Sequence, residues 1–484
     1  MARIIGRESE CKILNSLFES DKPEFLAIYG RRRVGKTHLI RRYFREKGVY
    51  FEMTGTKDGP MKEQLANFAI ALSSTFLEGK RCPIPHNWHA AFELLRKQVE
   101  QVASHRRVIL FFDELPWMST PRSDCLRALE HFWNRYLSNQ DNIILIVCGS
   151  AASWMIKKVI NNRGGLYGRL SRILHLLPFT LKDTEQLLKA KGIDLDRKQI
   201  VEFYMAVGGV PYYLNLASRG RSSAQMINEL FFSRDAPLAN EFNGLFESLF
   251  DHHEHHKKIV YILHNKPHGL SKNELLELVG LTSGGYSTTV FRELESSGFI
   301  GYMPPFGKKQ KGGNYILIDE LSLLHLNWLV SRSPGPFGEP GDDYWLKIRA
   351  TRKWTTWAGL AFEILCWKHV NGIKGALGIS GVQTSTSTWR FVPREANQEG
   401  AQIDLVIDRA DRCINLCEIK YSDSPFSVTK TYRKDLERKK RVFHQVTATR
   451  KALFTTLVTP FGVKKNSHSI AIVDNEVTLD DLFV

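Results

Sequence analysis

Long apolar runs are missing from this 484-residue chain. No stretch of roughly eighteen residues is continuously apolar, which excludes a membrane-spanning helix. The first residues, MARIIGRESE, lack the apolar segment of a secretory signal. Cysteine is sparse: its seven residues are scattered and form no CxxC pair, which argues against a disulfide framework and against a zinc site. We therefore expect a cytoplasmic protein with reduced thiols and no membrane association.

Acidic residues are also comparatively few. The 51 Asp and Glu residues face 67 Lys and Arg residues, so the formal net charge is +16. DNA or another polyanion is the natural partner of such a chain, because each neutralised phosphate releases counterions. The alternative is that the basic charge serves only solubility. A hydrophobic content of 43% is typical of globular proteins, and the length predicts about three domains.

The most specific motif is GRRRVGKT at 30–37. It fits the phosphate-binding pattern G-x-x-x-x-G-K-[ST], between a predicted strand at 25–29 and a helix that begins at Lys36. Backbone N–H groups surround the phosphates in such a loop, Lys36 reaches the outer phosphate oxygens and Thr37 ligates Mg²⁺. The predicted nucleotide-binding residues here are Gly30, Arg31, Arg32, Arg33, Val34, Gly35, Lys36, Thr37 and His38. The sequence leaves open whether the arginines face phosphate or pair with acids elsewhere.

Two further apolar segments predict strands of the same sheet. Segment 108–112 is apolar throughout, and Asp113 and Glu114 follow at its C-terminal end, where α/β sheets bind ligands. We predict that Asp113 holds Mg²⁺ and that Glu114 polarises the attacking water. Another strand, 142–150, ends at Ser150, which either senses the γ-phosphate or caps the following helix. ATP and Mg²⁺ are therefore the expected cofactors.

Several segments together resemble the archaeal-type ATPases of the STAND branch of AAA+ proteins. They are IIGRESE, GRRRVGKT, FFDE, GLYGRLSRILHLLPF (165–179) and VGGVPYYLNL (207–216). The resemblance implies an α/β fold with a parallel-sheet P-loop ATPase core over 1–180 and a helical lid over 181–248. It also implies a homo-oligomer that forms through the ATPase domain.

The same resemblance implies roles for residues outside the phosphate loop. Arg7 would lie near the adenine, and Pro211 would belong to the Gly-x-Pro element of the lid. Arg169 or Arg172 would be an arginine finger that reaches the nucleotide of a neighbouring subunit. The alternative for either arginine is an ordinary surface charge.

Residues 249–330 follow the pattern of a winged helix-turn-helix. Helical segments precede a predicted hairpin, and Ser271 with Glu274 forms a capping box. The tip of the hairpin carries Lys308, Lys309 and Lys311. The last helix of such a module can enter the major groove of DNA, or the module can serve as an internal docking surface. A linker rich in proline and glycine is predicted at 331–345.

Acidic residues at strand positions mark the segment GAQIDLVIDRADRCINLCEIKY, 400–421. Alternation places Asp404 on one face of a strand, and Glu418 and Lys420 on one face of its neighbour. Asp404 and Glu418 would hold a divalent metal, Lys420 would orient or activate water, and Glu363 would complete the metal shell. The alternative is that these residues are ordinary solvated edges of a small domain.

This D…ExK arrangement, with GLAFEILC and ALGISGVQTSTSTWR before it, resembles the PD-(D/E)xK nuclease-like module that follows the ATPase in a group of bacterial ATPases. The resemblance implies a restriction-endonuclease-like α/β domain over 346–484. The basic helix 430–446 either lines a DNA groove or is a solvated face.

The sequence thus predicts an ATPase that controls a Mg²⁺-dependent DNA endonuclease, in defence against mobile elements or in their maintenance. One rival hypothesis is an ATP-gated DNA-binding switch with an inactive nuclease-like domain. Another is an ATPase scaffold whose basic charge is incidental.

Overall fold

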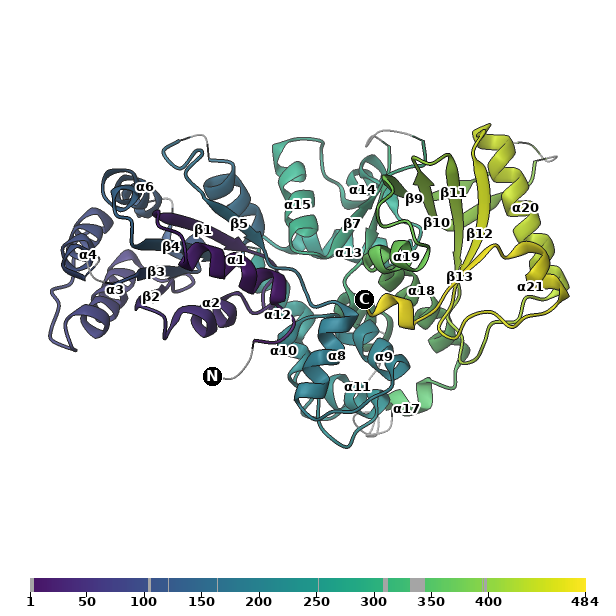
Figure 1. The fold of residues 1–484 in the computed structure, drawn as a ribbon, viewed down its shortest axis with the longest axis horizontal. Helices are drawn as coiled ribbons and strands as arrows, with labels where there is room; N and C mark the ends of the chain where they lie inside the picture. Colours follow the sequence, from purple (N-terminus) through teal and green to yellow (C-terminus); the bar gives the residue numbers. More distant parts are fainter. Residues whose placement is uncertain are drawn as a thin grey trace. The chain divides into compact units, whose positions relative to one another are not determined.

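A computed structural model describes most of the chain (Figure 1). The described residues are 4–102, 106–120, 122–162, 164–250, 252–307, 312–330, 344–393, 395 and 398–484. They form two compact units. The first comprises Met1–Pro178, Ser248–Asp251 and Phe291–Ser297, and the second comprises Phe179–Glu247, His252–Val290 and Gly298–Val484. Within the described residues, every helix is too short or too polar to cross a membrane.

A five-stranded parallel sheet with the order β2-β3-β4-β1-β5 is the centre of the first unit. Its strands are β1 (Glu24–Tyr29), β2 (Val49–Thr54), β3 (Val108–Asp113), β4 (Ile143–Gly149) and β5 (Arg172–His175). The central strands β3 and β4 are buried along their whole length. Helices cover both faces of the sheet, which explains why these strands are continuously apolar.

Alternate residues of β1 point into two separate cores. Phe25 and Ala27 belong to the core beneath α3 (Met61–Phe76), α4 (Trp88–Val102) and α6 (Cys125–Arg135). Leu26 and Ile28 belong to the opposite core, beneath α1 (Glu8–Phe18) and α2 (Lys36–Phe44). The short elements of this unit are α5 (Leu115–Met118), η1 (Leu137–Asn139), α7 (Ala152–Trp154) and the π-helical turn η2 (Met155–Ile160). Because β1, β3 and β4 are parallel neighbours, their C-terminal ends meet at one edge of the sheet.

The second unit begins with helices in the region predicted as the lid. They are α8 (Leu181–Ala190), α9 (Arg197–Val207), α10 (Pro211–Leu214), α11 (Ser223–Phe231) and α12 (Glu241–Leu249). The next elements are α13 (Glu254–His264), β6 (Leu270–Ser271), α14 (Lys272–Val279), α15 (Gly285–Ser296), β7 (Ile300–Met303), β8 (Asn314–Leu317), α16 (Glu320–Leu324) and η3 (His325–Leu329). The antiparallel strand order is β6-β8-β7, and Ser271 forms the predicted capping box with Glu274. Lys308, Lys309 and Lys311 lie outside the described residues, so the basic hairpin tip stays a prediction.

The linker prediction is wrong at its C-terminal end. Residues 331–343 lie outside the described part of the chain, but α17 (Tyr344–Ile348) already includes 344 and 345. Trp345 is buried and stacks on Phe232 at a ring-centroid distance of 5.3 Å. A linker composition does not account for this tryptophan, because the burial of its large apolar side chain favours an ordered helix.

The C-terminal part of the second unit, 344–484, contains a mixed five-stranded sheet with the order β13-β12-β11-β10-β9. Its strands are β9 (Thr384–Phe391), β10 (Ala401–Arg409), β11 (Cys413–Ile419), β12 (Ala452–Val458) and β13 (Asn475–Val477). Its other helices are α18 (Arg352–Lys368), α19 (Val370–Ala376), α20 (Lys430–Thr447), α21 (Ser467–Ile472) and η4 (Asp480–Leu482). Val442 and Phe443 of α20 pack into a core with Ile403, Val406 and Ile414 of the sheet. The basic helix thus has one buried face.

His369, which follows α18, connects this part of the unit to the start of α8. Its Nε2 accepts a hydrogen bond from the backbone N–H of Leu181 at 3.2 Å, and its Nδ1 lies 2.9 Å from the carbonyl oxygen of Leu365. These contacts require a neutral ring with its proton on Nδ1. Burial lowers the pKa of His369 to about 4, which maintains the neutral form.

We expect this contact to weaken in mild acid. The folded-state pKa lies below the unfolded value of about 6.5, so the unfolded chain binds more protons, and stability is lost as the pH falls from about 6.5 to about 4. At pH 5.5 the expected loss is about 1 kcal/mol. Urea unfolding at pH 7.5 and 5.5 should show this extra loss in the wild type but not in His369→Gln. Equal losses in both proteins would exclude His369 as the responsible group.

Candidate functional site

The predicted phosphate loop lies between β1 and α2. Gly30 has φ 149°, and a Cβ atom there would lie 2.3 Å from the carbonyl oxygen of Leu176, so this position requires glycine. Gly35, with φ 90°, precedes the first residue of α2. The Lys36 ammonium donates to the carbonyl oxygens of Gly30 and Arg31 at 2.9 and 3.0 Å. The loop thus holds its lysine inside the curve, where its charge and the start of α2 favour an anion.

The residues predicted to hold Mg²⁺ are brought together. The Thr37 hydroxyl donates to Asp113 Oδ2 at 2.7 Å, from the start of α2 to the end of β3. Asp113 is buried, at 3% exposure. A hydroxyl and a carboxylate are the hard oxygen ligands that Mg²⁺ prefers, and this cation keeps several waters and phosphate oxygens as further ligands. These residues therefore fit a nucleotide with Mg²⁺.

Ser150 links the lysine to the predicted water-polarising acid. Its hydroxyl accepts a hydrogen bond from Lys36 Nζ at 3.0 Å and donates to Glu114 Oε1. Its backbone N–H donates to Glu114 Oε2 at 2.9 Å. Ser150 does not cap the following helix, because the N-cap residue of α7 is Ala151. Both oxygens of Glu114 are thus held by Ser150, and Glu114 itself has left-handed backbone angles, with φ 51°.

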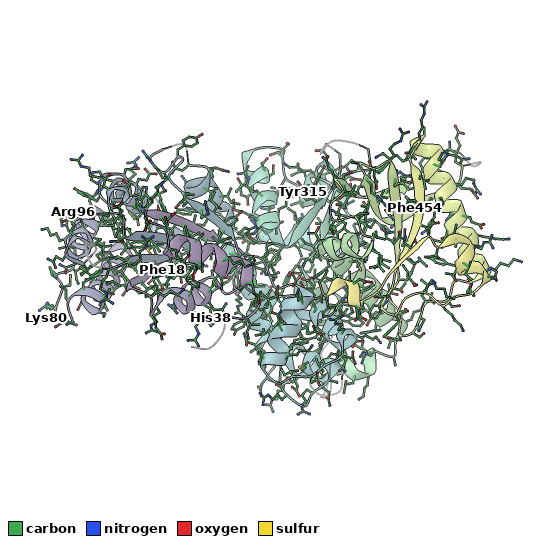
Figure 2. All side chains as sticks on the ribbon, viewed as in Figure 1. Phe18, His38, Lys80, Arg96, Tyr315 and Phe454 are labelled. Atoms are coloured by element: carbon green, nitrogen blue, oxygen red, sulfur yellow. The ribbon has the colours of Figure 1, made fainter. Side chains whose placement is uncertain are left out.

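The other residues predicted at the nucleotide site differ in how far their side chains are buried. The Arg7 guanidinium is buried and donates to the carbonyl oxygen of Val34 at 3.1 Å, which joins the N-terminal segment to the phosphate loop. Arg31 and Val34 are buried, whereas Arg32 and Arg33 are half-buried. His38 is exposed on α2 (Figure 2). The role of the loop arginines stays open.

The predicted arginine fingers belong to the first unit and the predicted lid proline to the second. Arg169 and Arg172 are both exposed, and Arg172 is on the edge strand β5. Pro211 is the first residue of α10 in the second unit, after Gly209, whose carbonyl oxygen accepts from the N–H of Phe179. The roles of these residues stay predictions.

The second predicted site lies where β10 and β11 run side by side. Lys420 Nζ is 3.6 Å from Asp404 Oδ2 and 3.7 Å from Glu418 Oε2. Asp404 Oδ2 also accepts a hydrogen bond from the backbone N–H of Ile419 at 3.0 Å. The register of β10 against β9 shifts between Ile403 and Val406, so an irregularity in the segment that contains Asp404 interrupts the simple alternation that the sequence suggested. We call Asp404, Glu418, Lys420 and Glu363 the acid cluster.

Burial and mutual repulsion alter the acidities of this cluster. Burial, with the nearby charge of Asp404, raises the pKa of Glu363 to about 8 and that of Glu418 to about 7. Burial alone would lower the pKa of Lys420, but the carboxylates of Asp404, Glu418 and Glu363 raise it. Several carboxyl groups thus lie close together at this site, and a bound cation would stabilise their charged forms.

Two side chains of α20 that the sequence analysis did not assign to the acid cluster contact it. Lys439, on the basic helix that was predicted to line a DNA groove or to be a solvated face, has its Nζ 2.6 Å from Glu418 Oε2, and the Tyr432 hydroxyl lies 3.5 Å from the same oxygen. Tyr432 and Lys439 are seven residues apart on α20, and this helical spacing was the available signal. Within the described residues, the other oxygen, Glu418 Oε1, is buried and has no hydrogen-bond partner.

The side chains of these acids do not by themselves supply a complete set of metal ligands. Among the described residues, no three His, Cys, Asp or Glu side chains are close enough together to hold a metal ion. The arrangement therefore does not support Glu363 as a third direct ligand. Asp404 and Glu418 alone fit Mg²⁺, which typically takes one or two carboxylates together with waters and substrate phosphate.

Comparison with known proteins finds a family for the N-terminal part. Residues 4–217 match the family described as an ATPase domain predominantly from Archaea. An uncharacterised protein of Methanocaldococcus jannaschii, MJECL04, is 25% identical over 328 residues, which are 67% of this chain and 68% of the relative.

Solved structures show more distant likenesses. The Walker-type ATPase PABY2304 of Pyrococcus abyssi is 17% identical with a TM-score of 0.46, and the match covers 67% of this chain and 96% of that protein. The ORC2 protein of Aeropyrum pernix, solved with ADPNP and ADP, is 14% identical with a TM-score of 0.43, covering 76% and 96% of the two chains.

The family match covers the whole phosphate loop, both residues that fit Mg²⁺, and the Glu114–Ser150 pair. The geometry of these residues agrees with the chemistry that the family performs, because the lysine, the hydroxyl and the acids converge at the C-terminal edge of one parallel sheet. Residues 4–217 of this chain therefore match an archaeal-type ATPase domain, and their phosphate loop has the geometry that such a domain needs to bind a nucleotide.

Proposed function

We propose that this protein is a nucleotide-gated DNA endonuclease, in which an ATPase domain controls Mg²⁺-dependent cleavage by the C-terminal domain. In the ATPase domain, Thr37 and Asp113 hold Mg²⁺, Lys36 binds the phosphates and Glu114 polarises water. In the C-terminal domain, Asp404 and Glu418 hold a separate Mg²⁺, and Lys420 orients the attacking water. A bound Mg²⁺ lowers the pKa of its water and stabilises the negative charge on the phosphate.

One observation carries the nuclease part of this proposal. Glu418 is 2% exposed, and its Oε1 has no hydrogen-bond partner in the described part of the chain. A buried, unsatisfied carboxylate oxygen is costly unless a ligand completes it. Its position beside Asp404 and Lys420 fits a metal with a phosphate. The test is cleavage of plasmid DNA with Mg²⁺ or Mn²⁺.

The domain assignments behind this function are also proposals. Residues 249–330 are proposed as a winged helix, supported by the helices and the three-stranded antiparallel sheet of that region. Residues 346–484 are proposed as restriction-endonuclease-like, supported by the acids at the adjoining ends of β10 and β11. DNA is the proposed partner, which the net charge of +16 supports. A homo-oligomer, with exposed Arg169 or Arg172 reaching a neighbouring nucleotide, completes the proposal.

A second function is favoured by the lysines at the acid cluster. Lys439 lies 2.6 Å from Glu418 Oε2, and Lys420 lies within 4 Å of both acids. Two ammonium groups can substitute for a metal in balancing these charges. On this alternative, the C-terminal domain grips DNA without cutting it, and the protein is an ATP-gated DNA-binding switch.

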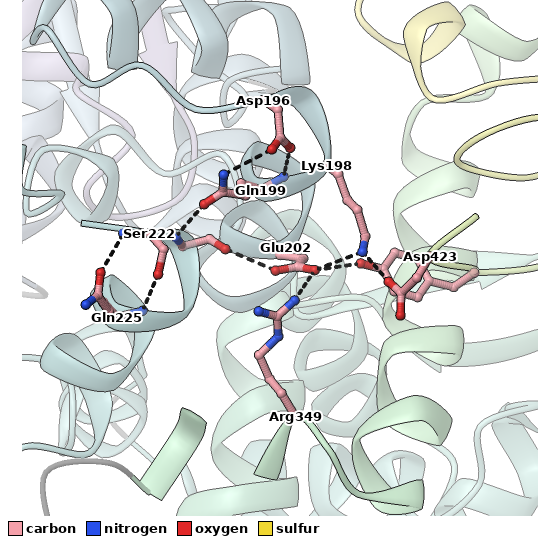
Figure 3. Close-up of polar contacts among 10 residues, drawn as sticks. Asp196, Lys198, Gln199, Glu202, Ser222, Gln225, Arg349 and Asp423 are labelled. Carbon is pink, nitrogen blue, oxygen red and sulfur yellow. Dashed lines mark hydrogen bonds and ion pairs between the residues drawn. The ribbon is translucent and has the colours of Figure 1, made fainter. Parts of the chain in front are cut away.

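The gating part of the proposal is supported by a buried acid in the lid helices. Glu202 of α9 is 5% exposed, and its Oε1 accepts hydrogen bonds from Tyr421 Oη at 3.1 Å and from Arg349 at 2.6 Å (Figure 3). Its other oxygen accepts from the Ser223 hydroxyl at 3.0 Å. Lys198, one turn earlier on α9, pairs with Asp423. These contacts join the lid helices to the segment that directly follows β11.

Tyr421 carries this connection to the acid cluster. It is the residue after Lys420, and its ring lies 5.4 Å from that of Phe362, the residue before Glu363. A movement of α9 would therefore shift two members of the acid cluster together. We propose that nucleotide binding changes the position of the lid helices and that Glu202 transmits this change.

We expect Glu202→Gln to uncouple the two activities. The amide keeps the shape of the side chain but removes the charge that holds Arg349, Lys198 and the Tyr421 hydroxyl together. ATP hydrolysis should stay within about twofold of wild type, whereas stimulation of DNA cleavage by ATP should fall about tenfold. Both rates are measured on the same preparation.

Glu229→Gln is the matched control, because Glu229 is also on a lid helix and pairs with Arg221 at 2.9 Å. It should keep full stimulation. If Glu202→Gln retained the wild-type stimulation, the connection through Tyr421 would be excluded.

A further inference from the structure

A cavity of about 200 Å³ opens beside the acid cluster. Glu363 and Asp404 form part of its wall, so a group inside the cavity lies next to the phosphate that the proposed function places there. The rest of the wall comes from two parts of the second unit. His268 and Asn314 belong to the region of β6 and β8, whereas Trp367 belongs to α18 and Arg390 to β9.

The two sides of this cavity are held together by contacts around it. Gln402 Nε2 lies 3.2 Å from His268 Nδ1, and Pro305 forms an isolated bridge with Thr388. The ring of Phe306 packs on Phe443 of α20 at 4.9 Å. The cavity is thus a preformed feature of this unit.

The lining combines flat rings with groups that form directional hydrogen bonds. Trp367 of α18 is half-buried, and its indole N–H donates to the backbone carbonyl oxygen of Asp404 at 3.1 Å. Arg390 is exposed, while Gln402 and Asn314 are half-buried and offer amide groups. An aromatic ring with neighbouring guanidinium and amide groups is the chemistry that binds a nucleobase by its face and its edge.

The size of the cavity limits what it can hold. Its volume of about 200 Å³ is below the roughly 300–1,000 Å³ of sites for drug-sized ligands. One planar heterocycle fits such a space, and a base pair does not. A base enters it only after leaving its own stack, which costs least when the base is already unpaired.

We propose that this cavity takes one unpaired nucleobase of the DNA strand whose phosphate lies at the acid cluster. The position of that phosphate rests on the proposed nuclease or DNA-binding function. The preferred substrate is then DNA with an unpaired nucleotide at or beside the bound phosphate, such as an overhang or a bulge. Continuous duplex is a poorer ligand, because the base must first be extruded.

The test compares how tightly the protein binds two DNA duplexes that differ only in one nucleobase. Each has a single bulged nucleotide, which carries adenine in one duplex and is abasic in the other. Binding of the full-length protein is measured by fluorescence anisotropy with Ca²⁺ in place of Mg²⁺, so that binding is followed without cleavage. We expect the wild type to bind the base-containing duplex about tenfold more tightly, as stacking of one base on an aromatic ring provides.

Arg390→Ala and Gln402→Ala should reduce this tenfold ratio to about twofold. Arg441→Ala removes the same charge from the exposed side of α20, where Arg441 pairs with Glu399, and should keep the full ratio. Equal binding of the two duplexes by the wild type overturns the proposal, even if the protein cleaves DNA. A tenfold ratio without cleavage supports the base cavity and counts against the nuclease.

Discussion

Asp404→Asn is expected to reduce Mg²⁺-dependent DNA cleavage by about 10³-fold without changing ATP hydrolysis. The asparagine can still accept the hydrogen bond from the Ile419 N–H, so the fold around β10 and β11 is preserved. It removes one of the two charges that fit the metal, and the loss of several kcal/mol of charge stabilisation corresponds to a rate effect of this size. Nicking of supercoiled plasmid, followed over time with and without ATP, measures the effect.

A control on the same strand separates a loss of charge from a loss of the site. Asp408 is also on β10, but it pairs with Lys451, away from the acid cluster. Asp408→Asn should cleave at the wild-type rate. If the wild type itself leaves DNA intact with Mg²⁺ and Mn²⁺, the nuclease proposal is wrong, and the DNA-binding switch is the remaining function.

Lys36→Ala is expected to abolish nucleotide binding. The Lys36 ammonium sits inside the phosphate loop and contacts Ser150, so its removal takes away both the charge that faces the phosphates and the link to Glu114. Affinity for ATP should fall at least about 100-fold, since hydrogen bonds to charged groups contribute roughly 1.5–3 kcal/mol each. Titration with a fluorescent ATP analogue measures the affinity, and phosphate release measures the turnover.

Lys47→Ala provides the matched control for this variant. Lys47 belongs to the same unit, but its ammonium lies over the ring of Tyr43, 3.5 Å from the ring centroid. Its replacement should leave both binding and turnover within about twofold of wild type. Retained ATP turnover in Lys36→Ala would show that the phosphate loop does not perform the catalysis assigned to it.

The proposed control of cleavage by ATP leads to a further prediction for Lys36→Ala. If ATP controls the acid cluster through the lid helices, cleavage by this variant should no longer respond to ATP. Cleavage in the absence of ATP should be unchanged, because Lys36 belongs to the first unit and the acid cluster to the second. A variant that still responds to ATP would require a second nucleotide site.

The nucleotide site was accessible to sequence analysis because its parts are local. Gly30 to Thr37 are consecutive, and Asp113 directly follows a strand that is apolar because helices cover both its faces. The convergence of Thr37 and Asp113 then follows from parallel strands ending at one edge. Ser150 was harder, since a serine after a strand is equally suited to capping a helix. The structure excludes the cap, because Ala151 is the N-cap residue of α7, and the sensing role stays a prediction.

The acid cluster was predicted less completely, for physical reasons. Its strand positions are visible as alternation, but the register shift between Ile403 and Val406 depends on the pairing of β10 with β9 and leaves no pattern in the sequence. Lys439 reaches Glu418 across 21 residues and Tyr421 reaches Glu202 across 219 residues. No spacing rule predicts such contacts, because tertiary packing sets the distance.

The sequence by itself therefore determined the chemistry of the phosphate loop, the parallel sheet that carries it, and the identity of the acids on β10 and β11. These features depend on local periodicity and on glycine conformation, which neighbouring residues specify. Only the tertiary structure decided that Glu418 has a buried oxygen without a partner among the described residues, that Glu202 lies against Tyr421, and that a cavity of about 200 Å³ borders Asp404. Those features arise where separate elements pack together, and packing is a property of the folded chain as a whole.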